Sequence, residues 1–311
     1  MESTEKHVNP SLWTRLRASI ELMRPANIVT AFSDILAGFA AAGGAIHILG
    51  GGITVTYDGL AWLLFSTFGL YGGGVVMNDY FDADLDAKER PERAIPSGRV
   101  SKTWAMILGA LLLIVGVAAA FQVNHYAGFL ALFIAISALF YDYKAKHSKL
   151  FGPLFMGLCR GGNLLLGMSL VPLVLLDLWP LMLIPLAYIG SITLISQGEV
   201  KGGSQAASYL ALSLVLLITV VLLVLSFLPE YQLYPAIPFV ILFGALVIPP
   251  FAKAARAPGP DNIKGAVKRG VISLIILNST LAAGFAGLFM GLIVVLLLPL
   301  SFLLAKAFAV T

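Results

Sequence analysis

Three aspartates, Asp79, Asp82 and Asp86, have the spacing in this chain that most directly suggests chemistry. On a helix, positions i, i+3 and i+7 share one face, so the three carboxylates point the same way. Such like charges repel one another unless a cation lies among them. Carboxylate oxygens without His or Cys favour a hard ion such as Mg²⁺, which commonly bridges carboxylates to substrate phosphates. The spacing therefore predicts a metal-bridged diphosphate site in which all three are metal ligands and catalytic residues.

The residues that flank the three aspartates also suit a phosphate group. Asn78 precedes them and can donate an amide N–H to a phosphate, so we expect it to bind substrate. Arg93 lies seven residues after Asp86, and its fork of N–H donors matches phosphate oxygens, which makes it a further catalytic candidate. The alternative is a solvated acidic helix end balanced by its own basic tail. The helical spacing directly after an Asn favours the catalytic interpretation.

The elements that must position these residues are membrane spans. The 311 residues are 59% hydrophobic and 12% charged, whereas about a quarter of a soluble domain is charged. A span needs about 20 apolar residues, and such runs recur along the chain. We predict an all-α polytopic membrane protein, a single domain over residues 1–311, with nine spans and a tenth if the last apolar block turns near Gly287 and Gly291. The predicted spans are 27–48, 59–80, 104–122, 125–143, 152–175, 179–197, 206–228, 236–253, 270–288 and 290–308.

Basic residues predict the orientation of these spans. With the N-terminus inside, the segments on the inner side and their flanks hold eighteen of the twenty Lys and Arg residues, and the predicted outer loops hold none. This asymmetry is typical of cytoplasmic loops. We therefore expect a multi-pass protein of the cell membrane with a cytoplasmic N-terminus. The net charge of +4 follows from the same loops, so no nucleic-acid partner is expected. The inner segments are 1–26, 81–103, 144–151, 198–205 and 254–269.

The first of these loops resembles the UbiA superfamily of membrane prenyltransferases. The family motif N-D-x-x-D-x-x-x-D after the second helix reads here as Asn78-Asp79-x-x-Asp82-x-x-x-Asp86. The following family element R-P-[ILV]-x-S-G reads as RAIPSG from Arg93, with Ala94 where proline is common. The LMRPAN sequence before the first span is also similar to the family's. The resemblance implies a helical bundle around a lipid-facing cavity, with loops after helices 2 and 6 that hold Mg²⁺ and the diphosphate of an isoprenoid donor.

The second loop departs from the family pattern. The resemblance implies about two aspartates there, but residues 197–205 read QGEVKGGSQ and contain no Asp. Glu199 is expected to bind substrate, with a solvated loop acid as the alternative. Lys201 is expected to act as a catalytic cation that holds diphosphate as a point charge, although it cannot replace a metal ligand. The GEVKGGS sequence is similar to the UbiA-like EboC branch, whose genes lie in clusters linked to metabolite export.

Polar residues inside the predicted spans are further candidates, because such residues are costly in a membrane. Asn27 shares a helical face with Asp34, and we expect Asn27 near the diphosphate; an interhelical hydrogen bond or salt bridge is the alternative for Asp34. Asp142 is expected to face the loop. Four more residues are expected to line the cavity mouth and bind substrate, with interfacial positions or snorkelling as the alternatives. They are Tyr141, Lys144, Arg160 and Asn163.

Together these features predict a Mg²⁺-dependent integral-membrane prenyltransferase. It would move an isoprenoid chain from a polyprenyl diphosphate to a small aromatic or lipid acceptor that is hydrophobic and reached from the membrane lipid. The alternative is a non-catalytic or divergent isoprenoid-binding or lipid-binding UbiA-like component of a metabolite export or membrane assembly, which the second loop favours. A secondary transporter fits poorly because the acidic cluster lies at the membrane edge. A CDP-alcohol phosphotransferase fits poorly because its D-G-x-x-A-R core is absent.

Overall fold

The computed structural model describes residues 12–43, 57–200 and 202–308, and within these ranges the chain is helical, without strands. Eight helical segments there are long and apolar enough to cross a membrane, and α2 is a shorter apolar helix. The structure therefore agrees with the predicted class of polytopic helical protein. The principal helices are α1 (Leu12–Met23), α2 (Pro25–Ala41), α4 (Tyr57–Glu89), α5 (Lys102–Phe121), α6 (His125–Tyr143), α7 (Phe151–Met168), α8 (Pro172–Leu178), α9 (Leu183–Ser196), α10 (Gln205–Val224), α11 (Leu233–Arg256), α12 (Pro260–Ala286), α13 (Leu288–Val295) and α14 (Leu297–Ala307).

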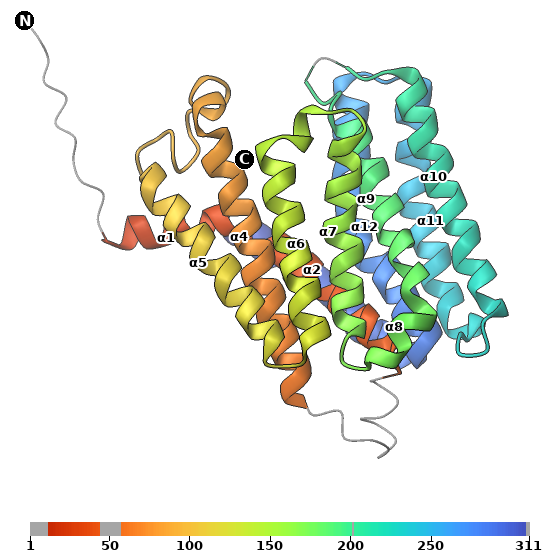
Figure 1. Ribbon diagram of the computed structural model, residues 1–311. Helices are drawn as coiled ribbons and strands as arrows, with labels where there is room; N and C mark the ends of the chain where they lie inside the picture. Colours follow the sequence, from red (N-terminus) through yellow and green to blue (C-terminus); the bar gives the residue numbers. More distant parts are fainter. Residues whose placement is uncertain (1–11, 44–56, 201, 309–311) are drawn as a thin grey trace, which may run out of the picture.

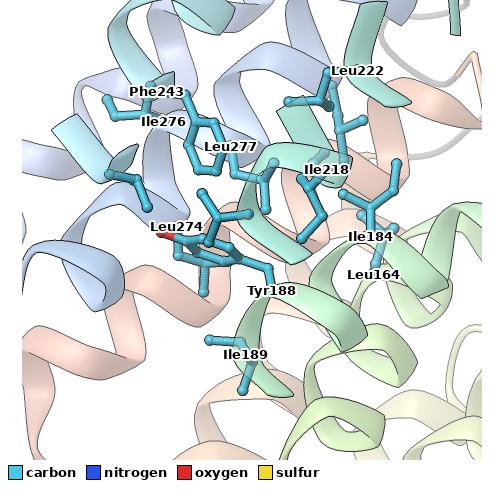
Figure 2. Close-up of a cluster of buried hydrophobic side chains, with 14 of the residues drawn as sticks. Leu164, Ile184, Tyr188, Ile189, Ile218, Leu222, Phe243, Leu274, Ile276 and Leu277 are labelled. Atoms are coloured by element: carbon cyan, nitrogen blue, oxygen red, sulfur yellow. The ribbon is translucent and has the colours of Figure 1, made fainter. Parts of the chain in front are cut away.

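The helices form one bundle with two packed halves (Figure 1). One buried cluster joins α4, α5, α6 and α7, and a larger one joins α7 with α9, α10, α11 and α12. Tyr188 lies in the larger cluster among Phe243, Leu274 and other apolar side chains (Figure 2). Its hydroxyl donates to the carbonyl oxygen of Gly270 over 2.8 Å, so the buried polar atom is satisfied. The helix α7 contributes to both halves.

Loops after α4, α6, α9 and α11 lie at one end of the bundle, at the top of Figure 1. These loops and their flanks carry the acidic motif and most of the basic residues. Loops that the sequence predicts on the same side of the membrane therefore lie at the same end of the bundle. Boundaries differ from the predicted ones in one place that matters. The fifth predicted span, 152–175, is broken, because α7 ends at Met168 and α8 begins at Pro172, where proline suits a helix start. The predicted span 27–48 corresponds to α2, and its last part lies outside the described residues.

A close crossing of α2 and α7 positions the interior of the site. A Cβ added to Gly38 would collide with the carbonyl oxygen of Leu164, and one added to Gly167 would collide with that of Ile35. Glycine at both positions therefore lets the two backbones approach to direct contact, as small residues commonly do between membrane helices. The crossing brings the polar residues of α2 beside those of α7.

Candidate active site

The acidic motif lies on the last turns of α4, which continues without a break from Tyr57 to Glu89. Asp79 and Asp86 are buried and share one partner, Arg93, in the turn that follows the helix. Its Nη1 lies 2.7 Å from Asp86 Oδ2 and 3.4 Å from Asp79 Oδ1. The two carboxylates thus neutralise one cation between them. The predicted helical face is present, and it faces protein rather than solvent.

A second arginine reaches Asp79 from a distant part of the chain. Arg24 Nη2 lies 2.6 Å from Asp79 Oδ1. Arg24 stands directly before Pro25 at the start of α2 and has φ 50°, a left-handed conformation that residues other than glycine rarely adopt. The proline also disfavours a helical conformation at the preceding residue. The chain therefore turns sharply at the residue that holds the acidic motif to α2.

The third carboxylate of the motif points elsewhere. Asp82 pairs with Lys146, which lies in the short turn after α6 and is largely buried. The neighbouring Lys144 is exposed and does not line the cavity described below. Lys146, and not the predicted Lys144, is therefore the basic residue after Tyr141 that contacts the motif.

A cavity of about 280 Å³ lies beside the acidic motif, between α2, α4, α6, α7, α9 and α12. Its walls combine apolar side chains with polar and charged groups. The apolar lining includes Leu70, Ile134, Met156, Ile189, Ile192 and Val271. The polar lining includes Arg24, Asn27, Tyr71, Asn78, Tyr141, Asp142, Cys159, Arg160, Asn163 and Thr193. Five of the predicted substrate-binding residues, Asn27, Asn78, Tyr141, Arg160 and Asn163, thus surround one cavity.

Asp142 was expected to face the loop, and this expectation is wrong. The side chain is buried and lines the cavity, where its Oδ1 accepts a hydrogen bond from Asn78 Nδ2 over 2.8 Å. The reason is helical periodicity: Ile134, Ala138, Tyr141 and Asp142 follow the i, i+4, i+7, i+8 pattern and all line the cavity. A helical wheel of α6 contains this signal, because it places Asp142 beside the Tyr that was selected.

A buried ion pair joins α2 and α7, and its arginine, Arg160, lines the cavity. Arg160 Nη1 donates to Asp34 Oδ2 over 2.8 Å, and Nη2 donates to Thr30 Oγ1 over 2.7 Å. The ring of Tyr71 lies over the guanidinium, with 4.8 Å between Cζ and the ring centroid. Arg160 is therefore held from several sides within the bundle and does not snorkel to the interface.

Two amides complete the surroundings of Asp34. Asn163 Nδ2 lies 3.1 Å from Asp34 Oδ2, and Asn278 Nδ2 lies 2.6 Å from Asp34 Oδ1. Thr67 donates to Asn163 Oδ1 over 2.8 Å and ties the network to α4. The network links α2, α4, α7 and α12 through hydrogen bonds, although Asn278 Oδ1 has no partner among the described residues, so Asp34 has the interhelical role that was the alternative interpretation of its position.

The donor atoms at the motif fit one hard cation. They are oxygens only, and the shared contact with Arg93 shows that Asp79 and Asp86 together balance a positive charge. Within the described ranges no three acidic, His or Cys side chains converge as a metal-binding group, because Asp82 is turned toward Lys146. The residues therefore suit an ion bound jointly with a phosphate ligand rather than an ion held by protein alone.

Comparison with known proteins identifies the family. A model of the UbiA prenyltransferase family matches residues 35–267. The chain belongs to this family. Digeranylgeranylglyceryl phosphate synthase of Methanosarcina mazei is 35% identical over 167 residues, which make up 50% of this chain and 55% of the relative. The chain thus spans about half the length of the curated relatives it matches.

Solved structures agree with this fold. A structure of digeranylgeranylglyceryl phosphate synthase has a TM-score of 0.65 at 23% identity, over 87% of this chain and 98% of that one. A UbiA homologue from Archaeoglobus fulgidus bound to GPP and Mg²⁺ has a TM-score of 0.59 at 12% identity, over 85% of this chain and 99% of that one. At these identities the likeness concerns the fold. The protein is a multi-pass member of the UbiA family, and its placement in the EboC branch stays a prediction.

The described residues of the second loop in this UbiA protein, 197–200 and 202–205, do not line the cavity. Glu199 is half-buried and does not line the cavity; burial raises its pKa, while Arg90 and Lys264 act in the opposite direction. The position of Lys201 lies outside the described residues. A Cβ on Gly198 would collide with Gly203, and Gly202 has φ 85°. The glycines thus serve a tight turn, and the described part of the loop offers no second metal site.

Proposed function

We propose that this UbiA protein is a Mg²⁺-dependent membrane prenyltransferase that moves an isoprenoid chain from its diphosphate to a lipid acceptor. One observation carries the proposal: Asp79, which Arg93 bridges to Asp86, adjoins Asn78 and Arg24, and these two residues line a cavity with apolar side chains on its walls. Such a site combines charge for a diphosphate with apolar wall for a hydrocarbon chain. The relatives named for a glyceryl phosphate product support a lipid acceptor over an aromatic one.

The diphosphate end of the donor would bind at the motif. Mg²⁺, held by Asp79, Asp82 and Asp86 together with the donor phosphates, would neutralise the charge of the leaving diphosphate. Arg93 and Arg24 contact Asp79, and their N–H groups would donate to the phosphate oxygens of a bound donor. When the bond between C1 and the bridging oxygen breaks, the bonding electron pair leaves with the diphosphate and an allylic cation remains.

The hydrocarbon end would lie in the cavity, against its apolar side chains. An allylic cation survives long enough to meet its acceptor only if water cannot reach it. Leu70, Ile134 and Ile189 provide apolar wall for the hydrocarbon chain. The acceptor would enter from the membrane.

We place the motif loops and the N-terminus on the cytoplasmic side, because these segments carry the basic residues.

A transfer assay tests the proposal directly. The protein in nanodiscs is given Mg²⁺, radiolabelled geranylgeranyl diphosphate and geranylgeranylglyceryl phosphate, and release of diphosphate and formation of the two-chain lipid are followed. We expect release in the wild type and none in Asp79→Ala/Asp82→Ala. Asp84→Ala is the matched control, since Asp84 is an exposed carboxylate of the same helix that pairs with Lys102. If the wild type binds the donor but releases diphosphate no faster than the double variant, the enzyme interpretation is wrong.

A second candidate function is binding of isoprenoid or lipid without catalysis, as part of an export or membrane assembly. The observation in its favour is the second loop, where Gly198 and Gly203 pack closely and Glu199 is the sole carboxylate. Donor binding measured without diphosphate release would favour this candidate. Lys201→Ala separates the loop's contribution: if Lys201 holds diphosphate, donor affinity falls at least about tenfold, or about 1.4 kcal/mol. Unchanged affinity would leave Lys201 as an ordinary cytoplasmic cation.

A further inference from the structure

Transfer of a prenyl chain to a hydroxyl acceptor releases a proton that the site must take up. The donor C1–O bond breaks and its electron pair leaves with diphosphate. A new C1–O bond forms to the acceptor oxygen, and the hydrogen of that hydroxyl must move to a base. A general base on the cavity wall, near the acceptor, would take up this proton. This requirement rests on the proposed function.

Asp142 is the carboxylate available for that role. It is the one acidic residue among the described side chains that line the cavity, and it is 3% exposed. The hydrogen bond from Asn78 reaches Oδ1 over 2.8 Å. Among the hydrogen bonds between described residues, none reaches Oδ2, so this oxygen is left for a ligand in the cavity. A carboxylate accepts only, so the amide nitrogen of Asn78 must face it, and the pair has one orientation.

The other carboxylates of the region are already engaged. Asp79 contacts Arg24 and Arg93, Asp86 contacts Arg93, and Asp82 contacts Lys146. Asp34 accepts from Arg160, Asn163 and Asn278 and does not line the cavity. Asp142 differs from all of them. Within the described part of the chain, no ion pair neutralises it in direct contact.

Asp142 lies beside the residues expected to hold the diphosphate, and Cys159 of α7 lines the same cavity. Asn78 stands one residue before Asp79, so the hydrogen bond places Asp142 next to the diphosphate end of the donor. A base at this point meets the acceptor oxygen where the new bond forms.

We propose that Asp142, oriented by Asn78, is the catalytic base that accepts the acceptor's hydroxyl proton. The base would act after C1 ionises, so its loss should leave donor binding and ionisation intact while capture fails. The diphosphate that departs from C1 is the competing proton acceptor. Tyr141 and Cys159 are weaker bases in their neutral forms, and they remain in place in the variant that tests Asp142.

The test separates ionisation from capture in Asp142→Asn. Geranylgeranyl diphosphate with ¹⁸O at the bridging position reports ionisation, because the label scrambles into the non-bridging oxygens whenever the C1–O bond breaks and re-forms. Transfer to geranylgeranylglyceryl phosphate reports capture. We expect scrambling and donor affinity within about threefold of wild type, and transfer at least about 100-fold slower, the range for loss of a general base. Asp84→Asn is the matched control and should leave both rates unchanged.

Each outcome bears on the proposal. Transfer by Asp142→Asn within about threefold of wild type would overturn it and assign the proton to diphosphate. Loss of scrambling together with transfer would also overturn it, because Asp142 would then act on the donor. If the wild type itself neither scrambles nor transfers, the proposed function fails first. Should the Asn variant not fold, Asp142→Ser keeps an acceptor for Asn78 without a base and carries the same expectations.

Discussion

Arg24 and Asp79 join the start of α2 to the end of α4, with 2.6 Å between Nη2 and Oδ1. Among the described residues, Arg24 is the one residue other than glycine with a positive φ. A strained backbone at a functional contact persists only where its surroundings enforce it. Here Pro25 and the carboxylate of Asp79 provide that constraint. The contact fixes the entry of α2, and α2 in turn carries Asp34 to its ion pair with Arg160, which lines the cavity.

The strain and the ion pair at Arg24 can be separated by two substitutions. Arg24→Ala and Arg24→Gly both remove the contact with Asp79, but only glycine adopts φ 50° without steric cost. Alanine should therefore be less stable than glycine by about 1 kcal/mol, while donor affinity falls equally in both. Unfolding in detergent and donor titration measure the two quantities. Equal stability of the variants would show that the local backbone relaxes.

The pair Asp34–Arg160 should behave as a buried salt bridge. Asp34→Leu alone leaves a buried guanidinium without its carboxylate, and we expect a loss of about 3–5 kcal/mol in the free energy of unfolding. The double variant Asp34→Leu/Arg160→Met removes both charges and should recover most of that loss. Unfolding of the four proteins of the cycle gives the coupling energy. A double variant as unstable as the sum of the single ones contradicts this account.

The sequence was sufficient for the fold class and the first motif, because both are local. Apolar length predicts the spans, and the i, i+3, i+7 pattern places the three aspartates on one helical face. Arg24, Lys146 and Asp142 enter the site through packing between helices distant in sequence, which the residues alone do not specify. Their signals were present but weak: an Arg before Pro25, and a helical phase in α6.

The second loop shows the opposite relation between sequence and structure. The absence of aspartate between residues 197 and 205 was visible at once, but its physical reason was not. Gly198 and Gly203 approach so closely that a side chain at Gly198 has no space. The segment is further held by a hydrogen bond from Gly203 N to Pro258 O over 2.9 Å. The loop is built as a compact turn, and this depends on a contact that sequence does not show.

The α2–α7 crossing predicts a large effect from one methyl group. Gly167→Ala would place a Cβ against the carbonyl oxygen of Ile35, and a backbone atom cannot move aside without shifting α2. We expect the thermal midpoint and transfer rate to fall together, because Asp34 is drawn away from Arg160. Gly265→Ala is the control: its Cβ meets nothing within 4 Å, and a helix gains about 0.5–1 kcal/mol from the change. Similar stability of the two variants would contradict the close crossing.

Arg93 tests whether the two carboxylates share one cation. Lysine keeps the charge of Arg93 but offers a single point donor, so it cannot reproduce the contacts with both Asp79 and Asp86. We expect Arg93→Lys to raise the donor Kd about tenfold, about 1.4 kcal/mol. Added Mg²⁺ should restore part of this affinity, because the ion would balance the carboxylate that lysine leaves without a cationic partner. Arg90→Lys, an exposed position three residues earlier, is the matched control. Donor titrations at two Mg²⁺ concentrations decide the matter: equal Kd values for the two variants would mean that Arg93 acts only through its charge.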